Sequence, residues 1–352
     1  MSCVLVLGLG DLGSRIAERL TSNRIVDRLI IAGRNPDRGH TYAELLATSD
    51  HLDVSFHGLD VLDVASCERL LRFARPDVVV QTACFISPWS FARLETPAAQ
   101  ALRRIGFGVQ LPFQIPCVRA VMQAVRGADF QGAVVNCSYP DATHALLSGE
   151  GLAPTIGIGN AAMMQACVEQ VLRRDGVDDV VRLIAHHAQT VSVMTSTPLA
   201  PDVRPWVFVG EHGRPAHELI DRVRAIRWSV ATNVLTAAVA VRAIGALLPG
   251  GASARLSSPG PMGLPGGYPM RVSTHGVDFD LPPDVTLAAA IAQNQLVGRV
   301  EGLAEIRDGI AMWTQKAARA LHVLGDGLAE PLESRAALPR ARRLARALAL
   351  TP

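Results

Sequence analysis

The sequence predicts an α/β fold, in which a parallel β-sheet with crossover helices is followed by an α+β part. Short apolar runs alternate with amphipathic stretches over residues 1 to about 160, which is the pattern of strand–helix–strand units in a parallel sheet. Runs such as Val4 to Leu7 and Val78 to Val80 contain no polar residue, as expected for strands that are buried on both faces. After about Thr155 the pattern changes to longer helical segments and a Gly-, Pro- and Ser-rich stretch.

The elements of the parallel sheet follow one another in order. We expect strands over residues 3–7, 28–32, 53–56, 77–82 and 132–136. The helices between them begin near Leu12, Thr41, Val64 and Gly108. Residues 84–106 interrupt this alternation. A long connection at the carboxyl edge of a parallel sheet favours a loop that covers a substrate, and a surface helix pair is the alternative.

The second part is less regular. We expect a helix over 160–174, a strand over 180–185, a helical region over 217–248, a hairpin-like stretch over 250–284, and a helix over 287–324 that breaks near Asp308. The tail from Arg335 onward is Arg-, Ala- and Leu-rich and indicates a peripheral helix. We therefore predict a nucleotide-binding domain over 1–158, an α+β substrate domain over 159–330 and a C-terminal helix or tail over 331–352.

Composition narrows the class of partner. The formal net charge is +2 and aromatic residues make up 5%, which argues against nucleic-acid or anionic-membrane binding. The six cysteines form no CxxC pair, so we expect a reduced, cytoplasmic protein with no metal site of the structural kind. The N-terminus lacks the pattern of a signal peptide, and we interpret the apolar stretch 230–248 as a buried helix rather than a membrane span.

A glycine motif follows the first expected strand. Gly8, Gly10 and Gly13 form Gly-x-Gly-x-x-Gly at the start of an amphipathic helix that includes Asp11 and Leu12. In this context the first glycine permits the turn, the second lets the backbone approach a pyrophosphate, and the third allows close packing of helix on strand. The positive end of the helix would hold the phosphates. The motif predicts a Rossmann-type doubly wound sheet that binds a dinucleotide.

The end of the second expected strand bears on which dinucleotide binds. NAD-binding chains usually place an acidic residue there, to take the ribose hydroxyls. Here the strand ends in Gly33, Arg34 and Asn35. An arginine beside a glycine leaves room for a 2′-phosphate and offers a guanidinium to bind it, and Arg38 could add a second charge. We expect NADP, with NAD, bound through Asn35, as the alternative.

Several later segments resemble the lactate/malate dehydrogenase superfamily, in matching order over roughly residues 1–325. Residues 80–84, Val-Gln-Thr-Ala-Cys, are similar to that family's strand ending in Thr-Ala-Gly. Residues 134–141, Val-Val-Asn-Cys-Ser-Tyr-Pro-Asp, resemble its strand ending in Asn-Pro-x-Asp, and Gly157-Ile158-Gly159 opens a helix as in the family. The resemblance implies an NAD(P)-dependent oxidoreductase that forms a homodimer.

The resemblance also implies roles for individual residues. Thr82 and Ala83 would lie against the dinucleotide, and Asn136 would lie near the nicotinamide and the substrate oxygen. His187 falls where the family has its catalytic histidine, so it is the expected proton relay, with its neighbour His186 as the alternative. The loop 84–106 would be the active-site loop and would offer arginines for a substrate anion: Arg93, Arg103 and Arg104.

The chain departs from the family at the residues that recognise a 2-hydroxy acid. The family's aspartate that orients the histidine and the arginine that binds a carboxylate fall at Met163 and Ala166, and the glycine after the histidine is Ala188. We therefore expect a small carbonyl, imine or alcohol substrate that is neither lactate nor malate. Residues 32–35 are also similar to saccharopine-reductase-like enzymes, which favours the imine option.

Two other classes stay open at this stage. A glycosidase family of the same fold uses NAD and a divalent metal ion held by Cys and His, although the chain has no cysteine near Asn160 where that ligand is expected. A non-catalytic NADP-sensing protein would keep the glycine motif and lose the acid–base pair, as Met163 and Ala166 suggest.

Overall fold

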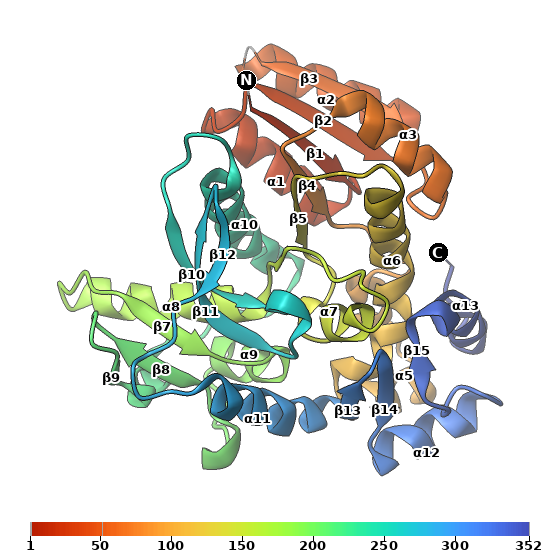
Figure 1. Cartoon of the computed structure of the whole chain (residues 1–352). Coiled ribbons are helices and arrows are strands. Elements are labelled where there is room, and N and C mark those ends of the chain that lie inside the picture. Colours follow the sequence, from red (N-terminus) through yellow and green to blue (C-terminus); the bar gives the residue numbers. More distant parts are fainter. Residues whose placement is uncertain (1, 51, 352) are drawn as a thin grey trace.

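The computed structural model describes residues 2–50 and 52–351. The first part of the chain forms a six-stranded parallel sheet in the order β3-β2-β1-β4-β5-β6 (Figure 1). Its strands are β1 (Cys3–Leu7), β2 (Arg28–Gly33), β3 (Asp53–Gly58), β4 (Val78–Gln81), β5 (Ala133–Asn136) and β6 (Ile156–Gly157). Five of these strands are those that the sequence predicts, and the doubly wound order is confirmed. The short strand β6 was not predicted.

Helices cover both faces of this sheet. They are α1 (Asp11–Ser22), α2 (Pro36–Asp50), α3 (Val64–Ala74), α6 (Leu111–Gly127) and α7 (Pro140–Ser148). Because successive strand residues point to opposite faces, Leu5 and Leu7 pack with α3 and α6, whereas Val4 and Val6 pack with α1 and α2. Every residue of β1 is buried, which explains the continuous apolar run in its sequence.

Local capping sets where the helices begin. Helix α2 begins at Pro36 rather than near Thr41, because the Asn35 side chain accepts a hydrogen bond from the Arg38 backbone N–H (3.0 Å) and proline suits a first helical position. The segment 84–106 contains two short helices, α4 (Pro88–Ala92) and α5 (Pro97–Arg103), followed by a 3₁₀ turn, η1 (Phe107–Gln110). The segment therefore contains a pair of helices, with Phe91 and Leu102 buried, and its expected role in covering a substrate stays a prediction.

The second part consists of helices and three small antiparallel sheets (Figure 1). Its helices are α8 (Asn160–Arg174), α9 (His187–Met194), α10 (Asn233–Leu247), α11 (Leu287–Gly298), α12 (Gln315–Leu324) and α13 (Ala337–Ala347). Its strands are β7 (Val181–Ile184), β8 (Trp206–Val209), β9 (Arg214–Pro215), β10 (Ala254–Pro259), β11 (Gly267–Ser273), β12 (Gly276–Phe279), β13 (Leu303–Arg307), β14 (Ile310–Trp313) and β15 (Leu332–Glu333). The remaining 3₁₀ turns are η2 (Pro201–Val203), η3 (His217–Arg222), η4 (Val230–Thr232), η5 (Pro261–Gly263), η6 (Arg299–Glu301) and η7 (Ser334–Ala336).

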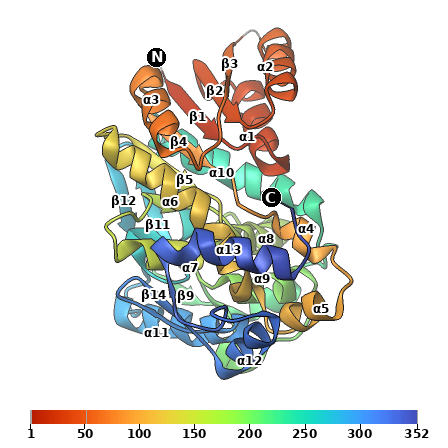
Figure 2. The ribbon, with the colours of Figure 1, turned by 90° about the vertical axis from the view of Figure 1, so that its right-hand side faces the viewer.

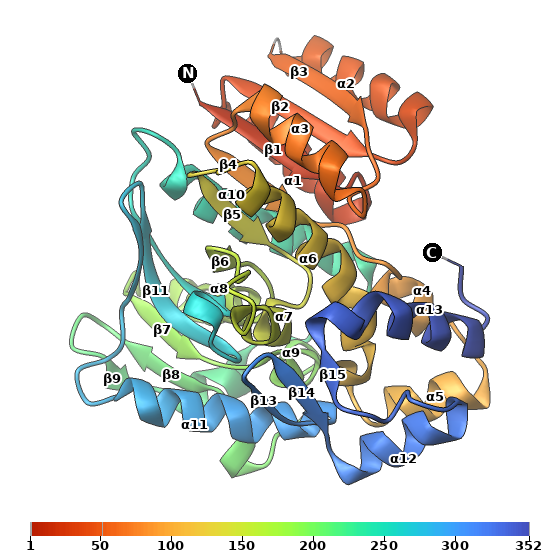
Figure 3. The same ribbon diagram turned by 45° about the vertical axis from the view of Figure 1, so that its right-hand side comes forward.

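Two predictions for the second part were wrong. The region 217–248 is not one helical stretch, since α10 begins only at Asn233 and short 3₁₀ turns precede it. The expected helix over 287–324 is two helices separated by the hairpin β13–β14. Asp308 and Gly309 have positive φ angles of 52° and 75°, so they form the hairpin turn (Figure 3) instead of a break in a helix.

The C-terminal helix is part of the core and not a separate tail. Helix α13 packs against α6 (Figure 2), and its Ala341 and Leu344 belong to the apolar cluster that also holds α3 and α6. Strand β15, which precedes it, pairs with β14. The predicted C-terminal segment is thus joined to the rest of the fold by the strand pairing of β15 and by the packing of α13.

One stretch of the described residues, Val230–Leu247, is long and apolar enough to be considered as a membrane span, with a mean hydropathy of 1.7. Its helix, α10, packs against α1 and α8 (Figure 3). Ala237, Ala240 and Ile244 are fully buried in that contact. This is the packing of a core helix, in agreement with the interpretation from sequence.

We predict that replacing Leu344 by alanine lowers the free energy of unfolding by about 2 to 4 kcal/mol, because the side chain is 1% exposed and its loss leaves a cavity against α6. Urea unfolding measures the change. The matched control is Arg342→Ala, an exposed position on the same helix, where a change within about 0.5 kcal/mol is expected. Equal losses in the two variants would contradict core packing of α13.

Candidate functional site

One cavity of about 880 Å³ connects the predicted cofactor residues with the second part of the chain. Its wall includes every residue that the sequence assigned to the cofactor: Gly8, Gly10, Asp11, Leu12, Gly13, Gly33, Arg34, Asn35, Thr82 and Ala83. The same cavity is lined by His187, Tyr139 and Glu301. The glycine turn and the expected proton relay therefore face one continuous space.

In the glycine turn, backbone segments approach one another too closely for a side chain to fit between them. Gly8 has a φ of 107°, and a Cβ there would lie 2.8 Å from the Ala83 nitrogen. A Cβ on Gly13 would lie 2.0 Å from the Gly8 carbonyl oxygen. Thr82 fastens the turn, because its hydroxyl donates to the Gly8 carbonyl at 2.8 Å. Glycine is thus required at Gly8 and Gly13 by packing within the protein.

The N-terminal end of α1 is suited to a phosphate. A Cβ built on Gly10, which caps the helix, would meet nothing within 4 Å, so the open side of Gly10 faces free space. No side chain of the described residues caps the helix at this end. The Asp11 carboxylate is directed elsewhere, to Arg15 (2.9 Å) and Asn233 (2.8 Å). The first backbone N–H groups of α1 are left for an anion.

The end of β2 carries two arginines. Arg34 and Arg38 line the cavity and are exposed, and within residues 2–50 and 52–351 neither guanidinium forms an ion pair or hydrogen bond. Asn35 uses its side-chain oxygen to cap α2, so it offers a ligand only its amide nitrogen. Asp60 also lines the cavity and accepts a hydrogen bond from the Leu62 N–H (3.0 Å).

A buried carboxylate holds the expected proton relay. His187 begins α9, directly after β7, and its Nδ1 is hydrogen-bonded to Glu301. The Glu301 side chain is 4% exposed and the His187 side chain 14%. The His187 backbone N–H donates to Asp141 (2.9 Å). The imidazole Nε2 forms no hydrogen bond with any residue that the structure describes, so it is the ring nitrogen available to a ligand.

Aromatic rings complete this cluster. The Tyr139 hydroxyl donates to the other Glu301 oxygen at 2.5 Å. Tyr139 has a φ of 47°, a left-handed conformation that is uncommon for a residue other than glycine. The rings of Phe107 and Tyr139 lie against the His187 ring, with centroids 4.3 Å and 5.0 Å from it. Three sides of the imidazole are therefore fixed by Glu301, Phe107 and Tyr139.

Electrostatics favours a charged imidazole in this place. Burial by itself lowers the pKa of His187, but the adjacent Glu301 carboxylate, with a smaller contribution from Asp141, raises that pKa above its ordinary value. Burial raises the pKa of Glu301, but the charge and hydrogen bond of His187, together with smaller contributions from His186 and the Tyr139 hydroxyl, outweigh burial and lower it. The pair is thus held as an imidazolium and a carboxylate, and burial raises the pKa of the Tyr139 phenol so that it stays protonated.

Two glycines let Glu301 reach the histidine. A Cβ on Gly106 would lie 2.5 Å from the Glu301 Cα, and a Cβ on Gly108 would lie 2.5 Å from the Glu301 carbonyl oxygen. The segment between α5 and α6 therefore approaches the η6 turn, backbone to backbone. This contact brings a carboxylate from the C-terminal third of the chain to the side of His187.

The structure places two other predicted residues away from the cavity wall. Asn136 is fully buried, and its amide holds the turn after β5 through Ser138 and Thr143 (3.0 and 3.2 Å). His186 caps α9, since its Nδ1 accepts from the Ala188 N–H (3.2 Å), and it is 3% exposed. Neither is among the described residues that line the cavity. Of the three residues proposed for catalysis, His187 alone faces the open space.

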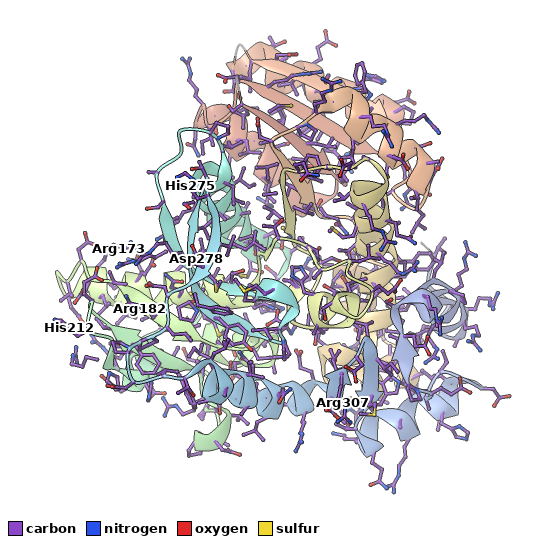
Figure 4. All side chains as sticks on the ribbon, viewed as in Figure 1. Arg173, Arg182, His212, His275, Asp278 and Arg307 are labelled. Carbon is purple, nitrogen blue, oxygen red and sulfur yellow. The ribbon has the colours of Figure 1, made fainter. Side chains whose placement is uncertain are left out.

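The loop arginines are also placed differently from the expectation. Arg93 and Arg104 are exposed and lie outside the cavity wall as described. Arg103 lines the cavity, but its guanidinium donates to the backbone carbonyls of Phe91 (3.3 Å) and Leu94. It therefore fixes the segment between α4 and α5 in this conformation. The exposed His212 lies in the turn between β8 and β9, at the edge of the molecule and outside the cavity wall (Figure 4).

Comparison with known proteins supports the fold. Neither a protein-family model nor a curated protein matches the chain. Among solved structures, the lactate dehydrogenase of Cryptosporidium parvum, complexed with lactic acid and nicotinamide adenine dinucleotide, matches with a TM-score of 0.53 and 17% identity, over 85% of this chain and 96% of that one. The malate dehydrogenase of Aeropyrum pernix matches with a TM-score of 0.51 and 16% identity, over 84% and 97%.

A third match is the lactate dehydrogenase of Eimeria maxima with NADH and oxamate, at a TM-score of 0.52 and 15% identity, over 84% of this chain and 90% of that one. Identity this low shows the fold alone. The chain has the fold of the lactate and malate dehydrogenases, a Rossmann-type sheet followed by an α+β part, as its resemblance to that superfamily implies.

Sequence reasoning missed Glu301. Met163 stands where an orienting aspartate was sought, and it lines the cavity with its sulfur 3.1 Å from the Thr236 hydroxyl. The carboxylate comes instead from η6, a segment that was assigned to the interior of a long helix. The sequence held only a weak indication that the helix ends before Glu301, namely the glycine that follows it. Gly302 has a φ of 91° and ends the η6 turn.

We predict that Glu301→Gln brings the pKa of His187 below the ordinary imidazole value of about 6.5, because burial then acts without the opposing carboxylate. NMR titration of the ring, assigned with a His187→Gln variant, measures the change. Glu305→Gln, on the neighbouring strand β13, is the matched control. A pKa of His187 that stays raised in Glu301→Gln would contradict the pairing.

The same pair makes stability depend on pH. The pKa of His187 is raised in the folded state, so its stabilising contribution is fully present below the unfolded pKa and is lost as pH rises through the folded pKa. We expect the difference in unfolding free energy between the wild type and Glu301→Gln to shrink as pH rises from neutrality. Urea unfolding at several pH values measures it, and a difference that grows with pH would contradict the assignment.

Proposed function

We propose that this chain is an NAD(P)-dependent oxidoreductase that reduces a small carbonyl or imine, or oxidises the corresponding alcohol or amine. The observation that carries the proposal is the single cavity that joins the glycine turn at Gly8–Gly13 to the His187–Glu301 pair. A phosphate-binding turn and an oriented acid–base group in one cavity are the two parts that nicotinamide-dependent hydride transfer needs. The shared fold agrees with this class of reaction.

Glu301 and His187 have different roles in the proposed acid–base chemistry. Glu301 accepts from His187 Nδ1 and thereby fixes the tautomer and the ring orientation. His187 Nε2 then gives a proton to the oxygen or nitrogen of the substrate during reduction, and takes it up during oxidation. When bound, the nicotinamide supplies or accepts the hydride. The raised pKa of His187 suits the proton-donating direction at neutral pH.

Tyr139 and Asp141 act as positioning residues. Tyr139 holds the second oxygen of Glu301, and Asp141 accepts from the His187 backbone N–H. Both belong to the start of α7, immediately after β5. Residues at the carboxyl edge of the sheet thus hold the histidine in position, while Phe107 covers one face of its ring.

The end of β2 supports NADP as the preferred cofactor, with NAD as the alternative. Arg34 and Arg38 have no partner among the described side chains and lie at the cavity wall beside Gly33. Two free guanidinium groups can hold a 2′-phosphate through charge-assisted hydrogen bonds. The residues that would hold the pyrophosphate are the N–H groups at the start of α1.

The other two classes have less support. A non-catalytic sensor was considered because Met163 and Ala166 replace an acid–base pair, but Glu301 supplies the carboxylate that this argument took to be missing. For the metal-dependent glycosidase, no group of three His, Cys, Asp or Glu side chains that could hold a metal ion occurs in the part of the chain that the structure describes. The expected homodimer and cytoplasmic location stay predictions.

We predict that Arg34→Ser weakens NADPH binding about 10- to 100-fold and changes NADH binding little, because a charge-assisted hydrogen bond contributes about 1.5 to 3 kcal/mol. Quenching of protein fluorescence on cofactor titration measures both dissociation constants. Arg69→Ser removes an arginine of the same sheet domain that lies outside the cavity, and both constants should stay unchanged. Equal weakening of NADPH and NADH in Arg34→Ser would contradict a 2′-phosphate site.

We predict that His187→Gln lowers kcat about 100- to 10,000-fold, the usual contribution of a general acid or base, while the dissociation constant of NADPH is unchanged. Stopped-flow measurement of NADPH oxidation gives the rate. His275→Gln, an exposed position in the turn between β11 and β12 (Figure 4), is the control. Undiminished turnover would remove His187 from the mechanism, and failure of both cofactors to bind would overturn the proposed function itself.

A further inference from the structure

Two tryptophans from separate parts of the chain form an aromatic pair in the wall of the cavity. Trp89 belongs to α4, in the segment that follows β4, and Trp228 lies in the loop between η3 and η4. Their ring centroids are 6.1 Å apart and the ring planes are tilted by 39°. Both residues are half-buried and line the cavity, so the pair is not sealed inside a core.

Hydrogen bonds place the loop that carries Trp228 beside α9. The Ile226 backbone N–H donates to the Met194 carbonyl at 2.6 Å, and the Ser196 hydroxyl donates to the Val223 carbonyl at 2.9 Å. Met194 is the last residue of α9, which begins at His187. Because a helix rises about 1.5 Å per residue, Met194 lies about 10 Å along the axis from the histidine. The Trp228 loop is thus joined to the end of the helix whose first residue is the proposed proton relay.

Exposed apolar side chains continue the cavity wall from the histidine. Val191 lies four residues after His187 in α9, so the two side chains lie on the same face of the helix. Val300 immediately precedes Glu301, whose carboxylate holds the His187 ring. Both valines line the cavity, and they are 43% and 52% exposed. A ligand that covers this apolar surface removes it from water, which is favourable.

The helix that carries Trp89 is held at both ends. The Ser87 hydroxyl accepts from the Trp89 backbone N–H at 3.2 Å and caps the start of α4. The Arg103 guanidinium donates to the Phe91 carbonyl at 3.3 Å and to the Leu94 carbonyl, near the other end of α4. Arg103 therefore fixes a helix that presents a tryptophan to the cavity. A binding surface that is already ordered loses little conformational freedom when a ligand binds.

We infer that Trp89 and Trp228 bind a planar apolar group of the substrate, such as a phenyl ring, while His187 meets the carbonyl oxygen or imine nitrogen. The inference rests on the proposed oxidoreductase function and names its substrate class, a carbonyl or imine compound with an aromatic substituent. Aromatic side chains bind a ring in offset-stacked or edge-to-face arrangements. Val191 and Val300 cover the atoms that link the ring to the reacting carbon.

The test compares ketones that differ in one substituent. Butan-2-one, 4-phenylbutan-2-one and 4-cyclohexylbutan-2-one are each titrated into the NADPH-loaded protein, and calorimetry gives the dissociation constants. We expect the phenyl compound to bind at least about tenfold more tightly than butan-2-one, and more tightly than the cyclohexyl compound, which is apolar but not planar. Equal affinity of the phenyl compound and either of the others, or binding of none, would overturn the inference. Failure of NADPH to bind would instead count against the proposed function.

Tryptophan variants assign the preference to the aromatic pair. Trp89→Leu and Trp228→Leu should each weaken binding of 4-phenylbutan-2-one at least about fivefold, with NADPH binding unchanged. Trp206→Leu, at a half-buried position outside the cavity wall as described, is the matched control and should leave both ligands unaffected. If the first two variants keep the circular dichroism of the wild type but weaken NADPH and the ketone alike, the tryptophans hold the cofactor and the inference is wrong.

A variant at an exposed position tests the apolar wall without disturbing a core. Val191→Gln should weaken binding of 4-phenylbutan-2-one at least about threefold, because a polar group then replaces apolar contact. Sedimentation equilibrium of the same variant measures its oligomeric state, which should stay that of the wild type. A changed oligomeric state with unchanged binding of the ketone would assign this apolar surface to a contact between copies of the chain and would overturn the inference.

Discussion

The contact between Glu301 and His187 is the interaction on which the arrangement of the site depends. The carboxylate fixes the ring through Nδ1 and the Tyr139 hydroxyl through its other oxygen. It also determines which protonation state is stable in a buried place, because burial alone would neutralise both groups. The Phe107 and Tyr139 rings, the left-handed backbone at Tyr139 and the glycines at Gly106 and Gly108 all serve the same close approach.

The glycine turn and the histidine obtain their positions from different physical sources. Parallel strands end at one edge of the sheet, so the turn after β1 and the start of α7 after β5 lie at the same edge, separated by the end of β4. The histidine instead begins a helix of the second part and is held by packing between α9, η1 and η6. The position of the glycine turn therefore follows from the order of the strands, whereas the position of His187 depends on contacts between side chains that are distant in the sequence.

The sequence could predict what is local, and it could not predict what depends on distant contact. Strands such as β1 follow from a buried apolar run, and the turn follows from glycines whose spacing has a steric cause. His187 was singled out because it matches the position of the catalytic histidine in the resembling family, and the structure places it at the cavity wall. Glu301 could not be found, because nothing local marks an η6 carboxylate as the partner of a residue 114 positions earlier. The sequence analysis assigned Asn136 and Arg103 to ligand binding. In the structure Asn136 accepts a hydrogen bond from the Ser138 N–H and Arg103 donates to the Phe91 carbonyl, and a sequence does not reveal such contacts.

The distance along the chain between these partners also orders the assembly of the protein. During synthesis the parallel sheet, complete at Gly157, and even His187 emerge long before Glu301. Contacts of such high sequence separation form late, after the entropy of closing a long loop has been overcome. Until the η6 turn docks on Gly106 and Gly108, the His187 imidazole lacks the carboxylate that orients it. Formation of the His187–Glu301 contact thus requires that the C-terminal third of the chain has packed against the segment between α5 and α6.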